Sequence, residues 1–254
     1  MTAVPNITRG AAEDALAARA SALTGAYRDL DPLALLRQAI ADDFPGRIAV
    51  VSSFGAESAV LLDFVAQVDR DIPVIFLDTG KLFWETRNYR DMLVARLGLR
   101  DVRSIEPSWY HLAKFDPDGG LHKTNPDLCC QIRKVLPLDD ALAGFDAWIT
   151  GRKRFQGFER EALPLAEVED GRIKINPLAR ETRVEISARF VARDLPYHPL
   201  VGEGYPSIGC QPCTGSAQDG DSARGGRWAG SDKTECGIHG ARWFRPEEAG
   251  EART

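Results

Sequence analysis

Four of the five cysteines occur in two close pairs, and this spacing is the clearest sign of chemistry in the chain. Cys129 and Cys130 are adjacent, and Cys210 and Cys213 form a Cys-x-x-Cys motif about eighty residues later. Four thiolates are soft ligands, which suit zinc or an iron–sulfur cluster better than magnesium or calcium. The two pairs therefore predict one metal site built from two segments of the chain.

Buried free thiols and disulfides are less consistent with this pattern of cysteines. Two separate pairs of buried free thiols would be a coincidence in so cysteine-poor a chain. We expect no disulfides, because the N-terminus shows no secretory signal and because adjacent cysteines strain against bridging each other. Asn125 and Pro126 suit the N-cap and first position of a helix, so Cys129 and Cys130 would lie in its first turn, where free amides and the helix dipole stabilise anions.

The fifth cysteine stands in a different context, the run Glu235-Cys236-Gly237-Ile238-His239. The stretch between Cys213 and this run is rich in glycine and serine, so we expect a flexible arm rather than packed structure. Arg224 and Arg227 lie within that arm. A lone thiol in polar, cation-bearing surroundings is typically reactive, which predicts that Cys236 is a nucleophile. The alternative is an incidental surface cysteine.

Three loops that follow predicted strands carry residues suited to binding an anion. Ser52-Ser53-Phe54-Gly55-Ala56-Glu57-Ser58 joins an apolar strand to a helix and can present backbone amides to a phosphate, although it is neither a Walker A loop nor a dinucleotide fingerprint. Asp78-Thr79-Gly80 and Gly151-Arg152-Lys153-Arg154 follow two other strands. Individually, the first could be an ordinary strand–helix turn and the last a solvated basic turn. Together, at one edge of a sheet, they predict a pocket for a phosphorylated nucleotide.

The elements that must position these loops alternate between strand and helix, which predicts an α/β domain with a mostly parallel sheet flanked by helices. We expect a helical region at 1–45, the nucleotide- and cluster-binding domain at 46–213 and a flexible catalytic tail at 214–254. Other predicted elements are helices near 11–23, 31–45 and 184–193, strands at 48–51, 73–77, 101–105 and 147–150, and a hairpin at 165–175 that we interpret as peripheral.

Composition limits the possible partners. The chain has 254 residues with a net charge of −5 and a pI near 5.5, which argues against non-specific binding to nucleic acid. No apolar run approaches the roughly 20 residues needed to cross a bilayer, and the N-terminus lacks a basic and then apolar signal. We therefore expect a cytoplasmic protein with neither a membrane nor a nucleic acid as partner.

The motifs, in their order along the chain, resemble the assimilatory sulfonucleotide reductases, and in particular the cluster-containing branch that reduces adenylylsulfate. The resemblance covers about residues 45 to 240 and is carried by Ser-Ser-Phe-Gly-Ala-Glu-Ser, Leu-Asp-Thr-Gly, Cys-Cys-x-x-Arg-Lys, Cys-x-x-Cys, Arg224-x-x-Arg227 and Glu-Cys-Gly-Ile-His. It implies an adenine-nucleotide α-hydrolase-like fold and one [4Fe-4S] cluster. The expected cluster ligands are Cys129, Cys130, Cys210 and Cys213.

The resemblance also implies the reaction. The Cys236 thiolate would attack the sulfur of adenosine 5′-phosphosulfate, expel AMP and form a cysteine S-sulfonate. Thioredoxin would then release sulfite, because no cysteine remains in the chain to resolve the intermediate. His239 could hold Cys236 deprotonated or serve only to position it. The expected substrate-binding residues are Ser52, Ser53, Phe54, Gly55, Ser58, Asp78, Thr79, Gly80, Arg133, Lys134, Gly151, Arg152, Arg224, Arg227 and His239.

Three alternatives remain open at this point. The substrate could be the 3′-phosphorylated nucleotide, or the chain could be an adenylating sulfur-transfer enzyme of related fold whose cysteines bind zinc. A non-enzymatic regulatory module with a metal site is the third, but neither of the last two needs a reactive cysteine on a glycine-rich arm. A homo-oligomer is possible, and the sequence carries no signal that determines it.

Overall fold

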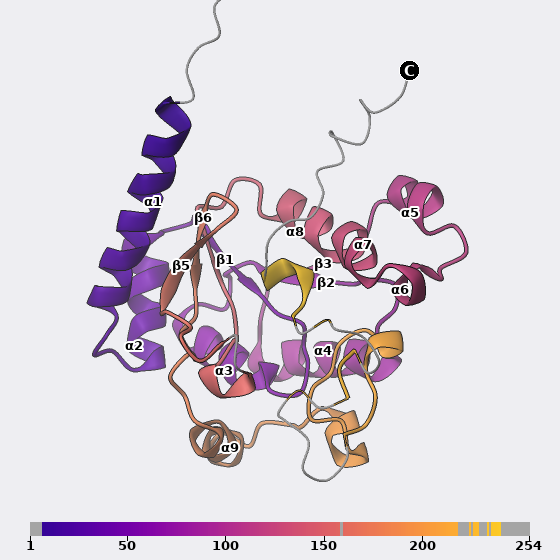
Figure 1. The fold of residues 1–254 in the computed structure, drawn as a ribbon. Coiled ribbons are helices and arrows are strands. Elements are labelled where there is room, and N and C mark those ends of the chain that lie inside the picture. The colour runs from indigo at the N-terminus through magenta and orange to yellow at the C-terminus, as the bar shows by residue number, and fades with distance from the viewer. Residues whose placement is uncertain are drawn as a thin grey trace, which may run out of the picture.

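A computed structural model of the chain describes residues 7–157, 160–217, 224, 226–228, 233 and 235–239. The described residues form a six-stranded sheet in the order β3-β2-β1-β4-β6-β5 (Figure 1). All neighbouring strands are parallel except β5 and β6, which confirms the predicted mostly parallel sheet. The strands are β1 (Ile48–Val51), β2 (Val74–Leu77), β3 (Val102–Ile105), β4 (Ala147–Ile149), β5 (Ala166–Glu169) and β6 (Arg172–Ile175).

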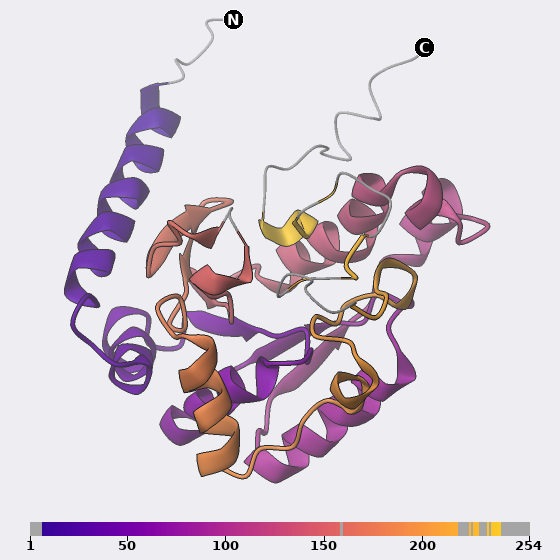
Figure 2. The same ribbon diagram turned by 60° about the horizontal axis from the view of Figure 1, so that its bottom comes forward.

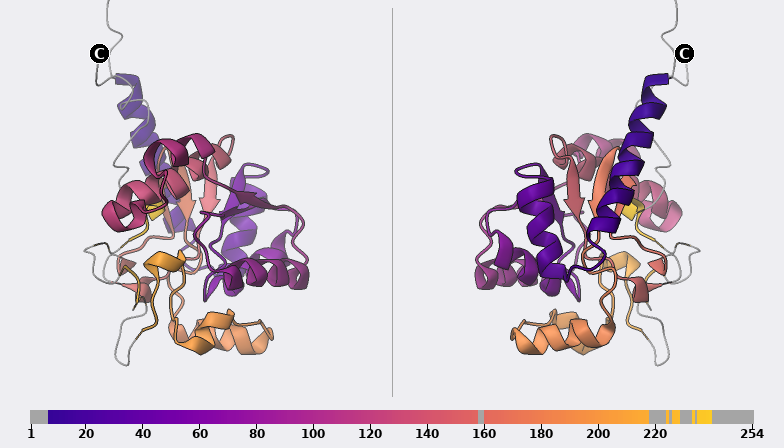
Figure 3. Two further views of the ribbon diagram at one scale, coloured as in Figure 1. Left: turned by 90° about the vertical axis from the view of Figure 1, so that its right-hand side faces the viewer. Right: turned by 90° about the vertical axis from the view of Figure 1, so that its left-hand side faces the viewer.

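Helices cover both faces of this sheet, and α1 lies along the edge formed by β5 and β6 (Figures 1 and 2). The first turns of α1 project beyond the rest of the fold, as the side views show (Figure 3). The helices are α1 (Ile7–Ala26), α2 (Pro32–Arg37), α3 (Ser58–Val68), α4 (Trp84–Leu97), α5 (Trp109–Phe115), α6 (Leu121–Thr124), α7 (Pro126–Cys130), α8 (Leu136–Ala141) and α9 (Arg183–Ala192). None of the described helices is both long enough and apolar enough to cross a membrane.

The apolar residues of the central strands alternate between two cores, as period-two side chains in a sheet covered on both sides must. Val50 of β1 packs in the larger core with Leu62 of α3, whereas Val51 packs in the smaller one with Leu138 of α8 and Trp148 of β4. Both faces of β1 and β4 are thus fully buried. The loops that follow these two strands therefore start from a rigid base.

The predicted start of the cysteine-bearing helix α7 is confirmed. The Asn125 side chain accepts a hydrogen bond from the Leu128 amide at 3.0 Å, and Pro126 takes the first helical position. This cap satisfies one of the amides that a helix start leaves without a partner. The helix continues as a π-helical turn over Gln131–Val135, which carries Arg133 and Lys134.

The hairpin predicted at 165–175 exists, but its interpretation as peripheral is wrong. β6 pairs with β4 in parallel and is therefore part of the main sheet. Lys174 on this strand and Asn176 just after it are fully buried. The alternation of residues showed a hairpin, whereas its place beside β4 depends on pairing between segments far apart in sequence.

Candidate active site

A cavity of about 210 Å³ opens at the carboxyl ends of β1 and β4, where α/β sheets commonly bind ligands. Five segments form its walls: the loop after β1, the loop after β4, the π-helical turn that carries Lys134, the stretch 206–209, and parts of the C-terminal region. Of the residues expected to bind substrate, the cavity brings together Ser52, Ser53, Gly55, Ser58, Lys134, Gly151, Arg152, Arg224, Arg227 and His239, and with them Cys236.

The loop after β1 is shaped by its own backbone. The Ser52 hydroxyl accepts the Phe54 amide at 3.2 Å, and Phe54 has a left-handed φ of 48°. The Phe54 ring does not line the cavity. It is fully buried edge-on against Phe76, at 5.4 Å between ring centres, and so anchors the loop in the core. A Cβ on Gly55 would lie 3.1 Å from the Ile208 carbonyl oxygen, so the glycine permits the close approach of the 206–209 stretch.

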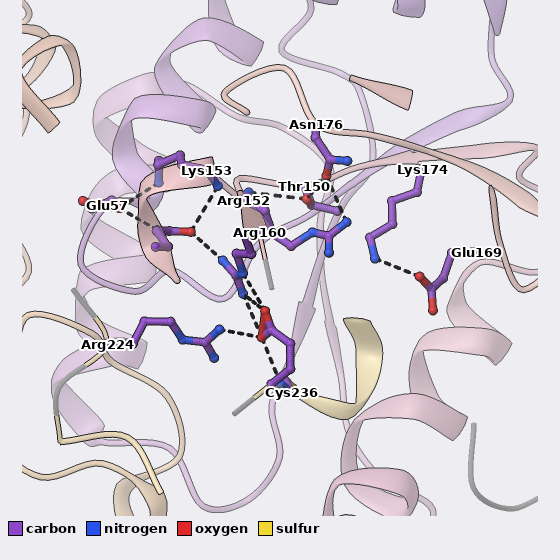
Figure 4. Close-up of polar contacts among 12 residues, drawn as sticks. Glu57, Thr150, Arg152, Lys153, Arg160, Glu169, Lys174, Asn176, Arg224 and Cys236 are labelled. Atoms are coloured by element: carbon purple, nitrogen blue, oxygen red, sulfur yellow. Dashed lines mark hydrogen bonds and ion pairs between the residues drawn. The ribbon is translucent and has the colours of Figure 1, made fainter. Parts of the chain in front are cut away.

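Glu57 ties the loop after β1 to the loop after β4 (Figure 4). Its carboxylate accepts hydrogen bonds from Lys153 Nζ at 2.9 Å and from Gln156 Nε2 at 2.8 Å. The Lys153 side chain is 3% exposed, and burial lowers its pKa while the nearby Glu57 opposes that shift. The pair fixes the two loops as opposite walls of the cavity.

Arg152 lines the cavity and lies beside a group of buried polar residues next to β6. Its guanidinium group makes an ion pair with Glu167. Beside it, the Thr150 hydroxyl donates to Asn176 at 2.8 Å (Figure 4). Burial lowers the pKa of Arg152 to about 10, so the group remains a cation at neutral pH. Its Nε atom is buried without a hydrogen-bond partner in the described structure, which leaves a donor for a bound ligand.

The Cys236 thiol lies at this cavity beside a lysine. Lys134 Nζ donates to Cys236 Sγ at 3.5 Å, and the Cys130 thiol also forms a hydrogen bond with it. The Cys130 hydrogen bond and then the Lys134 charge hold the pKa of Cys236 well below its usual value, against the opposing effect of burial. A thiolate is the nucleophilic form of cysteine, so the surroundings favour reactivity.

Glu235 fixes the residue before the nucleophile. It accepts two hydrogen bonds from Arg160, at 2.5 and 2.9 Å, and one from Arg224 at 2.6 Å. His239 continues the turn on the other side of Cys236, and its amide donates to the Cys236 carbonyl at 2.9 Å. Glu235 on one side and the short 3-10 turn Gly237–His239 on the other therefore hold Cys236 in place.

The His239 imidazole packs flat against Trp148, at 6.2 Å between ring centres and 5° between planes. Burial, followed by the charges of Lys174 and Arg152, lowers its pKa well below 6.5, so the ring is neutral at physiological pH. A neutral ring supplies no positive charge to a neighbouring thiolate. Of the two roles considered for His239, the geometry favours positioning.

Arg227 reaches the cavity because Gly209 makes room for it. A Cβ at Gly209 would lie 2.4 Å from an Arg227 guanidinium nitrogen. The guanidinium stacks on Trp228 at 4.3 Å, and Arg227 Nε donates to the Cys213 carbonyl at 3.3 Å. Arg227 thereby links the cavity to the second cysteine pair.

The four paired cysteines lie next to the cavity, on two segments that come near each other at Cys129. The backbone at Cys210 forms an isolated bridge with Leu82, and the Cys210 sulfur lies 3.2 Å from the Thr79 hydroxyl. Burial raises the pKa of Cys129 to about 11, and its neighbours include Cys210 and Cys213. Within the described ranges, no three His, Cys, Asp or Glu side chains are already gathered as in a metal site.

Some residues expected to bind substrate lie beside the cysteine pairs and not in the cavity. Both Asp78 oxygens accept hydrogen bonds from Arg87 at 2.8 Å. Arg133 is buried in an ion pair with Asp116 and donates to the Thr79 carbonyl at 2.8 Å. Gly80 completes this turn with a φ of 70°. These residues shape the wall around the cysteines.

Several residues that line or support the cavity were not predicted from the sequence. Arg160 belongs to no recognised motif, and Gln156 lies in a stretch without a pattern that could identify it. Lys153 belongs to the basic loop but is not among the expected substrate-binding residues. Residues 218–223, 225, 229–232, 234 and 240–254 lie outside the described residues, as does most of the arm predicted to be flexible.

Comparison with known proteins gives consistent results. The family model for the phosphoadenosine phosphosulfate reductase domain matches residues 47–216. The chain is 52% identical to an adenosine 5′-phosphosulfate reductase of Mesorhizobium japonicum, over 91% of each chain. It is 42% identical to a phosphoadenosine 5′-phosphosulfate reductase of Gloeobacter violaceus, over 84% of this chain and 90% of that one.

A solved structure with the same arrangement is the phosphoadenylyl-sulfate reductase of Candida auris in its phosphate complex. It superposes with a TM-score of 0.65 at 30% identity, over 76% of this chain and 94% of that one. The similarity confirms the predicted fold class, a mostly parallel α/β sheet of the adenine-nucleotide α-hydrolase-like kind.

Proposed function

The chain belongs to the phosphoadenosine phosphosulfate reductase domain family, and from this premise we propose that it reduces adenosine 5′-phosphosulfate to sulfite and AMP. The relative from Mesorhizobium japonicum, which matches nearly the whole chain, carries the name of that activity. The observation that supports it most directly is the Cys236 thiol beside Lys134 at a cavity lined with cations.

The cations of the cavity reduce the charge repulsion that is the main physical obstacle to the reaction. The sulfate group of the substrate is surrounded by negative charge, which repels an approaching thiolate. Lys134, Arg152, Arg224 and Arg227 line the cavity and would screen that charge. Amides and hydroxyls of the loop after β1, with Ser53 and Ser58 among the lining residues, would hold the nucleotide phosphate. Removing charge repulsion in a site of low dielectric is worth more than in water.

The proposed chemistry has two steps. Cys236 Sγ attacks the sulfur of the phosphosulfate; an S–S bond forms, the anhydride S–O bond breaks, and its electron pair leaves with AMP. A thioredoxin thiolate then attacks Cys236 Sγ and sulfite leaves with the electron pair of the S–S bond. The second thiol of thioredoxin resolves the mixed disulfide and regenerates Cys236. Thioredoxin is thus the proposed electron donor, and the cytoplasm the proposed location.

We further propose a [4Fe-4S] cluster on Cys129, Cys130, Cys210 and Cys213. The donor set fits, because four thiols are the chemistry that such a cluster requires, and Cys129 lies near Cys210 and Cys213. The Cys130 thiol, which is hydrogen-bonded to Cys236, would have to turn toward the other three. When bound, the cluster would supply an iron–thiolate link between α7 and the segment at 210–213. Zinc is the alternative metal, and purified protein distinguishes them because the cluster is brown and zinc colourless.

Reduction of the 3′-phosphorylated nucleotide is the second candidate function. It is favoured by the similarity to proteins named for that activity, from Gloeobacter violaceus and Candida auris. The choice of adenosine 5′-phosphosulfate depends on the two cysteine pairs, which by resemblance mark the cluster-containing branch.

A sulfite-release assay with thioredoxin as reductant tests both candidates. Purified enzyme receives each nucleotide in turn, and kcat/KM is compared. We expect the value for adenosine 5′-phosphosulfate to be far larger. Equal or reversed values would favour the second candidate, and no sulfite from either nucleotide would refute the proposed function.

A further inference from the structure

The carboxylate of Glu235 forms ion pairs with two of the arginines that line the cavity. Arg160 donates to it through two nitrogens and Arg224 through a third. Figure 4 shows Arg160 and Arg224 converging on one carboxylate. The side chains of Glu235 and Arg160 are only 15% and 9% exposed. An acidic group in this position is unexpected in a cavity suited to anions, because it cancels part of the positive charge there.

The same carboxylate also contacts the backbone of the nucleophile. Glu235 Oε2 accepts the Cys236 amide at 3.2 Å, so the two arginines are connected through Glu235 to the backbone at Cys236. Burial opposes ionisation of Glu235, but the charges of Arg160 and Arg224 outweigh it and hold the pKa of the carboxyl below its usual range. The carboxylate is therefore ionised at neutral pH and binds both guanidinium groups as an anion.

Apart from the hydrogen bond between Lys134 and Cys236, the other contacts of this segment with the described residues are mainly packing contacts. The turn Gly237–His239 lies against α7 and the π-helical turn after it, with Ile238 at the smaller core and His239 stacked on Trp148. Lys233 makes an ion pair with Asp127, whose side chain is 52% exposed and so contributes little. Glu235, with three hydrogen bonds from two arginines and a mostly buried side chain, is therefore a major polar attachment among the described residues of the segment.

We propose that Glu235 is a positioning residue that holds Cys236 at the cavity by binding Arg160 and Arg224, and that an anionic group entering the cavity competes for these arginines and loosens the attachment. Both guanidinium groups line the cavity, so an anion bound there meets the same N–H donors. The identity of that anion as the phosphosulfate rests on the proposed function. The attachment itself is a property of the resting chain and needs no turnover.

The accessibility of the Cys236 thiol to an alkylating reagent measures how firmly Glu235 holds the segment at the cavity. Wild-type enzyme and the variant Glu235→Gln are treated with iodoacetamide, and modification of the peptide that bears Cys236 is followed by mass spectrometry. The rates are compared at the plateau of the pH profile, where Cys236 is fully ionised, so that a change in thiol pKa does not contribute. Hydrogen exchange at the same peptide gives a second readout, which includes the His239 amide bonded to Cys236.

We expect modification of Cys236 to be about tenfold faster in Glu235→Gln, the change that loss of one charge-assisted hydrogen bond produces. Glu161→Gln is the matched control, since it removes one negative charge from an exposed residue next to Arg160 and should leave the rate unchanged. Inorganic sulfate should accelerate the wild type toward the rate of Glu235→Gln and leave that variant unaffected. Sodium chloride at equal ionic strength should do neither.

Equal rates in Glu235→Gln and the wild type would overturn the attachment, and a wild-type rate indifferent to sulfate would overturn the competition. If Glu235→Gln does not fold, Glu235→Asp takes its place; it retains the charge on a side chain one methylene shorter and should also speed modification. A chain that releases no sulfite but shows these rate changes would refute the proposed function alone. Sulfite release without them would refute only the role of Glu235.

Discussion

Removal of the Lys134 ammonium group is the most direct test of how this site activates its thiol. The Nζ atom lies 3.5 Å from Cys236 Sγ, so the change Lys134→Gln takes a full positive charge away from the thiolate. At this distance, two unit charges attract by about 1 kcal/mol with the dielectric constant of water and about 5 kcal/mol with an effective value of 20. Because about 1.4 kcal/mol is a factor of ten in an equilibrium constant, even the lower limit makes the thiolate roughly fivefold less favoured once the charge is removed.

The expected direction follows from the charge. Lys134 stabilises the thiolate, so its loss raises the pKa of Cys236, and at any pH below that pKa less of the thiol is ionised. Below the midpoint of the pH–rate profile, the rate of alkylation of Cys236 should therefore fall at least about fivefold. The midpoint should move upward, while the plateau at high pH stays where it is.

The assay is the pH dependence of iodoacetamide modification at Cys236, read from the mass of its peptide. Lys123→Gln is the matched control, because Lys123 is an exposed lysine on α6, in the segment just before α7. Iron content is measured in each variant first, so that a change in the metal site is recognised. An unmoved midpoint in Lys134→Gln, with normal iron content, would refute the role assigned to this lysine.

Four further outcomes are expected. Cys236→Ser should abolish sulfite release while nucleotide binding persists. In wild-type enzyme given adenosine 5′-phosphosulfate without reductant, mass spectrometry should show a gain of about 80 Da on Cys236, the mass of a sulfonate. Anaerobically purified protein should contain about four iron and four sulfide per chain, and Cys210→Ala should lower both in elemental analysis. Burial holds the pKa of His198 at about 4, below its usual 6.5, so protons bind more strongly to the unfolded chain. The free energy of unfolding should therefore fall by about 3 kcal/mol as the pH drops from 6.5 to 4. Urea unfolding at each pH measures this fall, which should be smaller in His198→Gln. Leu62 is fully buried in the larger core, so Leu62→Ala should lower the free energy of unfolding by about 2–5 kcal/mol in the same experiment.

Much of the fold could be predicted from sequence because the signals are local. The apolar run at Ile48–Val51 and the alternation after it depend on neighbouring residues, and so does the cap formed by Asn125 before α7. The two cysteine pairs and the isolated Cys236 likewise stood out by residue type and spacing. Each of these features is a property of a few contiguous residues, and the structure has the predicted strands and helices close to the predicted ranges.

Which charged side chains form ion pairs with each other depended on the tertiary structure. Asp78 and Arg133 looked suited to a nucleotide, but sheet order and helix packing bring them to Arg87 and Asp116, which neutralise them beside the cysteines. Arg160 carried no signal, because its importance arises from Glu235, a residue 75 positions away.

The sequence by itself determined which residues can do chemistry: four thiols for a metal site, one thiol for attack, and loops at strand ends for an anion. Only the tertiary structure decided which cations reach the thiol and which are already bound to a carboxylate. The physical reason is that ionic contacts act over a few ångströms and join residues that the order of the strands brings together. That order is set by burial of both faces of the sheet, a property of the whole domain and not of any single segment.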